Sequence, residues 1–211
     1  MVLLSPTVGG LREMLEVCEN YADVHGLLYN VKKSEYMIFR AGGRCLDNSP
    51  SVTLNGLSVN RVTKFKYLGH FLSDGLEVDV DIERERRALA VRGNMLARRF
   101  SRCSDEVKTI LFKAYCQSFY SGSLWVRHTK RSLDVLRIQY NNVFRMMLGL
   151  PRFCSASGMF ALYRTDGFHA VIRKKTASLI CRLRGSRNKI LETVADRFSS
   201  PLWRSFVRRV I

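Results

Sequence analysis

The stretch VDVDIERERRALAVRGNMLARRFSR, residues 78–102, combines an apolar stripe with a cationic face. At about 100° of rotation per residue, six residues of low polarity share one narrow side of a helix: Val78, Ile82, Leu89, Gly93, Leu96 and Phe100. Six arginines lie opposite, within an arc of roughly 140°: Arg84, Arg87, Arg92, Arg98, Arg99 and Arg102. The pattern predicts a helix from about Asp79 to Arg102 that packs on one side and is cationic on the other.

The cationic face indicates a nucleic-acid contact rather than an ordinary solvated surface. A solvated helix face usually mixes both signs of charge, whereas this one carries almost no negative charge. Ala88, Val91 and Met95 lie among the arginines, so the face has a small apolar floor that suits phosphates and sugar edges. We therefore assign nucleic-acid binding to the six arginines.

An acidic cluster opens the same segment and allows two interpretations. Its members are Glu77, Asp79, Asp81, Glu83 and Glu85. Asp79 and Glu83 lie one helical turn apart, as metal ligands can, but a third convergent ligand is missing. Carboxylates at a helix start also offset the positive end of its dipole, and this interpretation is preferred. The sequence predicts no metal site, and its lone histidines predict no catalytic triad.

More helices follow. Ser104 is a predicted N-cap, and the helix after it is expected to bury Val107, Ile110, Leu111, Ala114, Tyr115 and Phe119. The next helix is expected to end at Gly149, before Pro151, and to bury Leu133, Leu136, Tyr140, Val143, Phe144 and Met147. Shorter helices are predicted after Ser155, over about Phe168–Arg184, and past Pro201.

Residues 1–73 mix helix and strand signals. Val8–Tyr21 has the pattern of an amphipathic helix, and short strands are expected at Val2–Leu4 and Tyr36–Phe39. Asn55-Gly56 is typical of a type I′ hairpin, and Thr63–Leu72 supplies another strand. The predicted fold class is α+β, with the strands confined to the first part of the chain.

Charge is distributed unevenly along the chain. Lys and Arg number 35 against 18 Asp and Glu, a net charge of +17. Residues 1–80 carry eight basic and nine acidic side chains, and the remainder carry 27 and nine. This balance predicts a polyanionic partner for the second part, nucleic acid first and an anionic membrane second. Membrane binding ranks lower because the apolar stripe of residues 78–100 has no Trp and is needed for packing.

The six cysteines and four histidines do not fall at zinc-ligand spacings, so no zinc site is predicted. Cysteines so far apart are typical of reduced thiols in the core of an intracellular protein. The sequence contains neither a signal-peptide apolar region nor an apolar run of about 18 residues. An intracellular protein, nuclear or cytoplasmic, is expected.

Five segments stand in an informative order: Met1–Ser5, Val8–Tyr21, Gly26–Glu35 (GLLYNVKKSE), Phe65–His70 (FKYLGH), and Phe144–Arg152 (FRMMLGLPR) with Ser155–Ser157. In this order they resemble the reverse transcriptases of non-LTR (LINE-like) retrotransposons, in the part that follows the catalytic Tyr-Ala-Asp-Asp box. Each segment is a weak signal by itself, but five in the family's order are a strong one.

The resemblance implies a partial palm β-sheet with one helix, followed by an all-α basic thumb-like domain. Residues 1–73 would be the C-terminal part of the palm with its primer-grip hairpin, 74–150 the thumb, and 151–211 a helical C-terminal extension. It also implies that Lys33 matches a general acid that protonates departing pyrophosphate. Tyr67, Leu68 and Gly69 would match the primer grip, where a glycine lets backbone approach phosphate.

The family's catalytic box would lie before Met1, so the carboxylates that hold two Mg²⁺ ions in the complete enzyme are missing. Lys33 would then be inactive, and no cofactor is expected in this chain. The expected function is a truncated RNA-directed DNA polymerase fragment that keeps sequence-independent binding of RNA, DNA or an RNA/DNA hybrid. The upstream palm and fingers would be a further partner.

The alternative is an autonomous basic helical DNA- or RNA-binding module recruited from a retroelement. The two hypotheses differ in foldability. A recruited module should fold alone, whereas a palm fragment would expose an unpaired sheet edge at Val2–Leu4.

Overall fold

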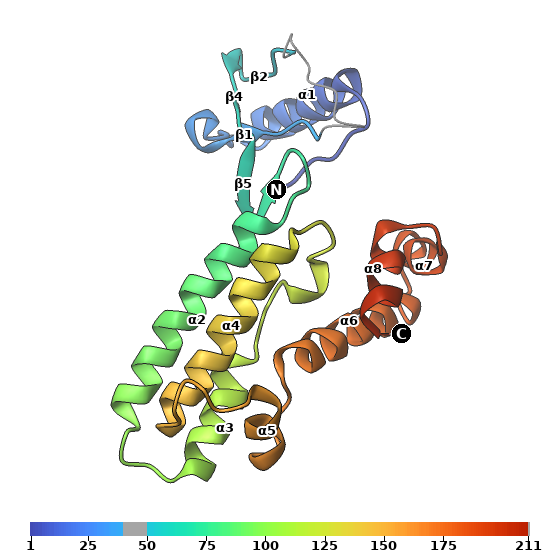
Figure 1. Ribbon diagram of the computed structural model, residues 1–211. Helices are drawn as coiled ribbons and strands as arrows, with labels where there is room; N and C mark the ends of the chain where they lie inside the picture. Colours follow the sequence, from blue (N-terminus) through green and yellow to red (C-terminus); the bar gives the residue numbers. More distant parts are fainter. Residues whose placement is uncertain (40–49, 211) are drawn as a thin grey trace. The chain divides into compact units, whose positions relative to one another are not determined.

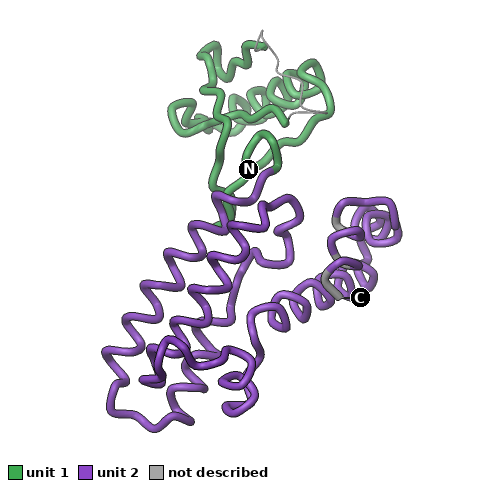
Figure 2. Tube along the Cα trace, in the orientation of Figure 1, with its two compact units in different colours: residues 1–76 green, residues 77–211 purple. Residues whose placement is uncertain are grey.

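The structure is a computed structural model that describes residues 1–39 and 50–210, and the chain forms two compact units (Figure 1, Figure 2). Unit 1 is Met1–Leu76 and unit 2 is Glu77–Ile211. Unit 1 contains one long helix and short strands, and unit 2 is helical, so the predicted α+β class is confirmed. The predicted boundary at 150/151 falls inside unit 2, and the three-part division stays a prediction.

Unit 2 is built on two helices that run side by side in the same direction. They are α2 (Asp79–Arg99) and α4 (Lys130–Leu148), and α3 (Asp105–Cys116) lies between them in the sequence (Figure 1). Asp79 accepts hydrogen bonds from Thr129 where both helices begin. Further along, a Cβ added to Gly93 would lie only 2.6 Å from Val143 Cγ1. The absence of a side chain at Gly93 therefore permits the close packing of α2 on α4.

An aromatic cluster forms the centre of the core. Phe144 contacts Phe112 with ring centroids 4.5 Å apart and stacks on Phe160, at 5.1 Å and 17°, from α5 (Ala156–Leu162). Tyr140 packs on the same rings, and its hydroxyl donates to the Asp166 carbonyl over 2.7 Å. Burying rings of this size supplies much of the hydrophobic stabilisation of a domain, so unit 2 has a substantial core of its own.

Several helix ends lie where the sequence predicts them. The side chains of Ser104 and Ser155 each accept a hydrogen bond from a backbone N–H three residues ahead and start α3 and α5. Gly149, with φ +66°, ends α4 in the left-handed conformation that glycine adopts easily. The helix α2 ends at Arg99 rather than Arg102, because the chain turns at Phe100–Cys103.

The prediction of the buried face of α3 is wrong. Val107, Ile110 and Tyr115 are 42%, 63% and 50% exposed, and the buried residues are Thr109, Phe112 and Cys116. Both sides of this helix carry apolar side chains, so periodicity alone does not select one. The side with Phe112 is the buried one because its ring joins the aromatic cluster. Phe119 is buried as predicted, but it lies beyond the end of α3.

Three helices complete unit 2. The predicted helices appear as α6 (Phe168–Arg184) and α8 (Pro201–Val210), and α7 (Lys189–Asp196) was not predicted. Asn188 starts α7 by accepting a hydrogen bond from the Ile190 N–H over 3.0 Å. Both α7 and α8 pack on α6.

Unit 1 has a small core under α1 (Val8–Val24). Val52, Leu54 and Val59 are its buried residues, and Leu11 and Leu15 of α1 pack against them. The strands β2 (Thr53–Leu54) and β3 (Leu57–Ser58) form the predicted Asn-Gly hairpin, with φ +51° at Asn55 and +72° at Gly56. Positive φ at both central residues is the signature of a type I′ turn.

Three strand predictions in unit 1 differ from the structure. Val2–Leu4 forms no strand, and Met1 and Leu4 are 82% and 77% exposed. The strand expected at Tyr36–Phe39 is reduced to β1 (Glu35–Tyr36), which pairs in parallel with β4 (Asn60–Arg61). A short apolar run becomes a strand only where a partner strand is available. Thr63–Leu72 is a hairpin of β5 (Lys64–Tyr67) and β6 (His70–Ser73) rather than one strand.

Five of the six cysteines lie in the described residues, and all five are free thiols, while Cys45 lies outside them. Only Cys116 among the five is buried, so the predicted core placement holds fully for that residue alone. Burial raises the pKa of the Cys116 thiol to about 11, against the opposing charge of Arg92. In the part of the chain that the structure describes, no helix combines the length and apolarity needed to cross a membrane.

The contact at Gly93 gives a first prediction. Gly93→Ala is expected to lower the free energy of unfolding by about 1–3 kcal/mol, because overpacking against Val143 outweighs the better helix propensity of alanine. Urea denaturation followed by far-UV circular dichroism measures the change. Gly158→Ala in α5 is the control, because a Cβ there meets nothing nearer than 3.7 Å. Equal stabilities for the two variants would contradict the close α2–α4 packing.

Candidate nucleic-acid interface

The start of α2 is tied to the start of α4. The Val78 N–H donates to the Arg127 carbonyl over 3.0 Å. Asp79 Oδ1 accepts from the Thr129 N–H over 2.9 Å and from its hydroxyl over 3.0 Å. Desolvation acts against the charge on Asp79, but hydrogen bonds from Ser132 and Thr129 outweigh it and lower the pKa of this carboxyl. Asp79 of the acidic cluster therefore joins two helices, a role that the dipole interpretation did not predict.

Asp81, the next carboxylate, is completely buried. Its Oδ2 accepts hydrogen bonds from the Ser121 hydroxyl over 2.6 Å and from Trp125 Nε1 over 2.9 Å. Its Oδ1 accepts from Arg84 Nε over 2.8 Å. A carboxylate without water is tolerated only when such donors replace its hydration. These bonds join α2 to the segment around η2 (Gly122–Leu124) and fix the rotation of α2 about its own axis.

Glu85 is 2% exposed and extends the buried network. It pairs with Arg84 over 3.2 Å and with Arg92 over 2.5 Å. Burial opposes the charge on Arg84, yet the hydrogen bond that it donates to Asp81 and the charges of both carboxylates raise the pKa of its guanidinium. The side chains of Arg84 and Arg92 are only 25% and 28% exposed. Two of the six arginines assigned to nucleic acid therefore neutralise internal carboxylates.

Arg87 is exposed but already holds an internal anion. Its Nε lies 2.8 Å from Glu83 Oε1, and its side chain is 75% exposed. Arg86 binds the same carboxylate through two nitrogens, over 2.7 and 2.8 Å. The hydrogen bond from Arg86 is the largest cause that lowers the pKa of Glu83 to about 2; desolvation opposes it, and Arg87 lowers the pKa further. A phosphate would have to compete with Glu83 for Arg87.

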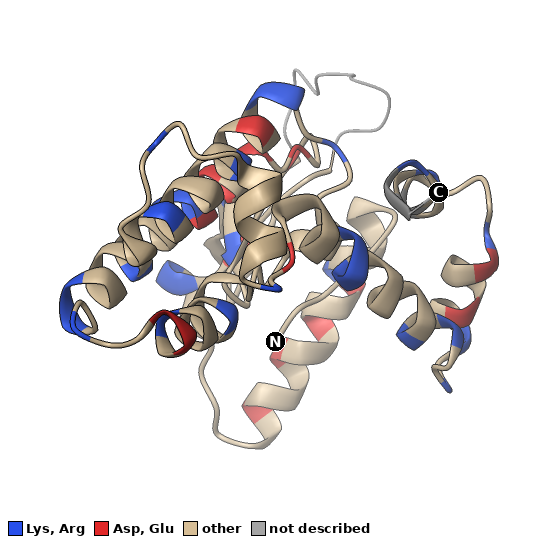
Figure 3. Cartoon of the chain, turned by 60° about the horizontal axis from the view of Figure 1, so that its bottom comes forward, with Lys and Arg blue, Asp and Glu red and all other residues tan. Residues whose placement is uncertain are grey.

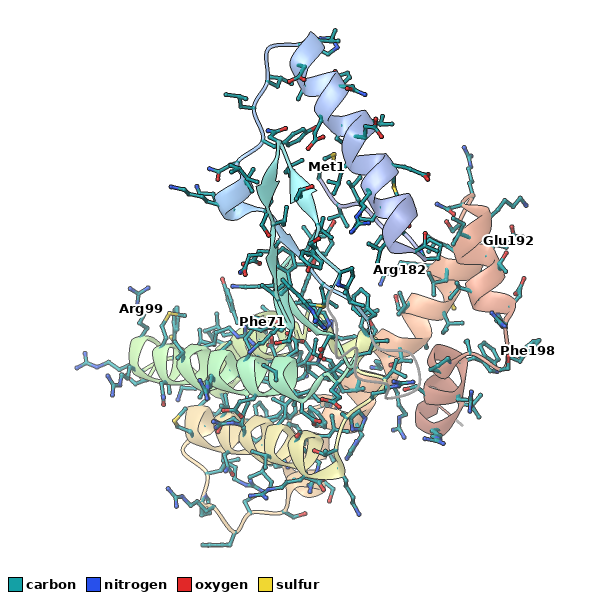
Figure 4. The ribbon with its side chains drawn as sticks, turned by 90° about the horizontal axis from the view of Figure 1, so that it is seen from above. Met1, Phe71, Arg99, Arg182, Glu192 and Phe198 are labelled. Atoms are coloured by element: carbon teal, nitrogen blue, oxygen red, sulfur yellow. The ribbon has the colours of Figure 1, made fainter. Side chains whose placement is uncertain are left out.

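The last three arginines of the predicted face are exposed, as Arg87 is, but differ from it in their partners. Arg98, Arg99 and Arg102 are exposed, and no carboxylate in residues 1–39 and 50–210 pairs with them. Arg99, labelled in Figure 4, lies at the end of α2, where the helix dipole also favours cations. Val91 and Met95, earlier on the same helix, are 68% and 42% exposed and supply the expected apolar floor. Figure 3 shows basic positions spread over the helices of unit 2, and acidic ones along α1.

The candidate residues of unit 1 lie in two local motifs. Lys33 is exposed at the end of η1 (Val31–Lys33), where its N–H donates to the Asn30 side chain over 3.1 Å. Tyr67, Leu68 and Gly69 form the tip of the β5–β6 hairpin, with φ +47° at Leu68 and +81° at Gly69. Among the described residues, no hydrogen bond or ion pair joins Lys33 to this tip.

The sequence contains a pattern that indicates the buried network of Asp81, Glu85 and their arginine partners, although the hydrophobic periodicity alone does not reveal it. Asp81 and Glu85 are four residues apart at the border of the apolar stripe, a place where carboxylates need internal partners. Arg86 was not among the predicted site residues because it lies outside the cationic arc. In the structure it pairs with Glu83. Within the described residues no group of three or more Asp, Glu, His or Cys could hold a metal ion. The arrangement favours anion binding by arginines.

Comparison of the chain with protein-family models, curated proteins and solved structures finds no match in any of the three.

The Glu83 ion pairs predict a pH dependence. The pKa of Glu83 falls from 4.5 to about 2 on folding, so its pairs stabilise the folded state fully above pH 4.5. That stabilisation is lost as the pH falls toward 2. Because the side chain is 40% exposed, Glu83→Gln is expected to cost only about 0.5–1 kcal/mol at neutral pH.

Urea denaturation of both proteins between neutral and acid pH should show this difference shrinking below pH 4.5. Glu16→Gln, at an exposed position of α1, is the matched control and should show no comparable trend. A Glu83→Gln effect that stayed constant down to pH 2 would mean that the ion pairs contribute nothing.

Proposed function

We propose that unit 2 binds nucleic acid through its phosphate backbone, without reading base sequence, and that the end of α2 makes the contact. The observation that carries this proposal is the joint exposure of Arg98, Arg99 and Arg102 without a carboxylate partner in the described part of the chain. The guanidinium group binds phosphate through two parallel hydrogen bonds. RNA, DNA and an RNA/DNA hybrid all present such phosphates, and phosphate contacts carry no sequence information.

The charge of unit 2 supports a polyanion over a small anion. Residues 77–211 hold 27 of the 35 basic side chains and 11 of the 18 acidic ones. At least four of the acidic ones, Asp81, Glu83, Glu85 and Asp166, are engaged by arginines or lysines of the same unit. The excess positive charge therefore lies on exposed side chains, as in proteins whose association with nucleic acid is steered electrostatically.

The resemblance to non-LTR reverse transcriptases adds to this proposal that the chain derives from such an enzyme. In that reading unit 1 is the end of a palm, unit 2 contains a thumb, and Tyr67, Leu68 and Gly69 hold a primer end. The tight β5–β6 turn supports it, because Gly69, at φ +81°, has no side chain that would keep a phosphate from the backbone. The described residues do not fit the Mg²⁺ ions of the complete enzyme, since they gather no set of carboxylates. We therefore propose binding alone for this chain, without a catalytic role for Lys33.

The autonomous module is the second candidate; the separate core of unit 2 allows it, and the stability of unit 1 distinguishes it from a palm fragment. The main core consists entirely of residues of unit 2, from Val78 to Ile172, whereas unit 1 has a separate core with three buried apolar side chains. Helices that bury their own aromatic cluster do not need the strands of unit 1 for stability.

Amide hydrogen exchange on the full chain tests how far unit 2 is independent. We expect the amides of α2 and α4 to be the most protected and those of unit 1 to exchange through smaller local openings, because unit 1 buries far fewer apolar side chains. Uniform protection of both units would contradict the truncated-palm interpretation and favour a single recruited module.

The salt dependence of binding tests the proposed contact. On duplex DNA each phosphate contact contributes about −0.9 to the slope of log affinity against log salt, so replacing Arg98, Arg99 and Arg102 by Gln should flatten it by roughly two to three units. The control replaces Arg127, Lys130 and Arg131, three exposed cations near the start of α4, and should flatten it by less than about one unit. Equal flattening in both variants would show diffuse attraction, and absence of binding to duplex and single strands alike would refute the proposed function.

A further inference from the structure

Phe198, in the turn between α7 and α8, and Trp203, in the first turn of α8, form an aromatic pair beside Arg184. Phe198 and Trp203 have ring centroids 4.9 Å apart at an interplanar angle of 83°. The Arg184 guanidinium, from the end of α6, lies 4.8 Å from the centroid of the Trp203 ring. Phe198 is nevertheless 64% exposed, so most of its ring is open to solvent. In Figure 4 it lies on this turn, well away from Arg99 at the end of α2.

Local hydrogen bonds fix the turn that carries Phe198. The Trp203 N–H donates to the Ser200 hydroxyl over 3.1 Å, which caps the start of α8. The Arg204 guanidinium donates twice to the Ser199 carbonyl, over 2.9 and 3.2 Å. A ring presented by a fixed turn and supported by a perpendicular second ring loses little conformational entropy when it stacks on a ligand.

Exposed arginines are frequent in the segments that hold the aromatic pair, and Arg184 contacts it directly. The exposed arginines of this region are Arg182, Arg184, Arg187, Arg197, Arg204 and Arg208. Residues 182–208 contain two carboxylates, Glu192 and Asp196, and Glu192 is paired with Lys189 over 2.9 Å. Aromatic faces among arginines are the combination by which proteins bind single-stranded nucleic acid, stacking bases on rings while cations contact phosphates.

From this geometry we infer that Phe198 stacks on an unpaired base of single-stranded RNA or DNA, with Trp203 supporting the ring and the surrounding arginines contacting the backbone. The bases of a duplex stack on one another, so their faces are not available to Phe198. The inference rests on the proposed function in taking nucleic acid as the ligand, but it assigns a second site on residues that the α2 contact does not use. The name C-terminal stacking site denotes Arg184, Phe198, Trp203 and Arg204.

The test compares two single strands of equal charge bound by the full chain. One is an oligothymidylate of about twelve nucleotides, and the other is an abasic strand with the same number of phosphates. Fluorescence anisotropy should show the thymidylate binding at least about fivefold more tightly, because stacking requires a base. Phe198→Ala should abolish this difference and leave duplex binding and the far-UV circular dichroism unchanged.

Ile190→Ala is the matched control, because Ile190 is 73% exposed on α7 but has no ring. It should retain the preference for bases. Tryptophan fluorescence gives a second readout, because Trp125 is completely buried and any quenching by the thymidylate then reports Trp203. Trp203→Phe should remove that quenching.

Three outcomes would overturn the inference. The first is equal affinity for the two strands, and the second is a preference for bases that survives Phe198→Ala. The third is Phe198-dependent binding to phosphatidylserine vesicles without preference for thymidylate over the abasic strand, which would assign the site to a lipid surface. If duplex binding still depends on Arg98, Arg99 and Arg102 in these cases, the proposed function stands and only the C-terminal stacking site is refuted.

Discussion

The orientation of α2 depends on the hydrogen bonds that Ser121 and Trp125 donate to the buried carboxylate of Asp81. A carboxylate in this position without donors would cost several kcal/mol, so α2 packs only where both donors and the Arg84 guanidinium reach it. In this orientation of α2, Arg84 and Arg92 pair with the buried carboxylates of Asp81 and Glu85, whereas Arg98 and Arg99 remain exposed. The distribution of charge on the surface of α2 is therefore a consequence of electrostatics in the core.

Periodicity predicted the buried faces of α2 and α4 but not that of α3, and local signals predicted helix ends. Ser104, Gly149 and Ser155 mark helix ends because capping involves only neighbouring backbone groups, which the sequence itself names. The buried side of α3 depends on which face meets the aromatic cluster, and this is a long-range property. The six arginines likewise share one arc on a helical wheel. Which of them are free to bind a ligand depends on the ion pairs that they form with carboxylates in the folded protein.

The two proposed contacts use different physics and make different demands on a ligand. The α2 arginines need closely spaced phosphates and are indifferent to base pairing. The C-terminal stacking site needs an exposed base and loses its advantage on a duplex. The first was visible in the sequence as a run of arginines. The second depends on Arg184, Phe198 and Trp203 meeting across three separate segments, and no spacing rule brings those residues together.

The thiols of this chain also offer a chemical handle. Because the thiolate is the reacting species, the raised pKa of Cys116 together with its burial makes that residue inert to alkylating reagents near neutral pH. Cys181 is the one exposed cysteine among the five that the structure describes, and it lies on α6 one turn before Arg184. A maleimide-linked dye or a photocrosslinker coupled there would be anchored beside the aromatic pair, where bound ligand could be captured and mapped.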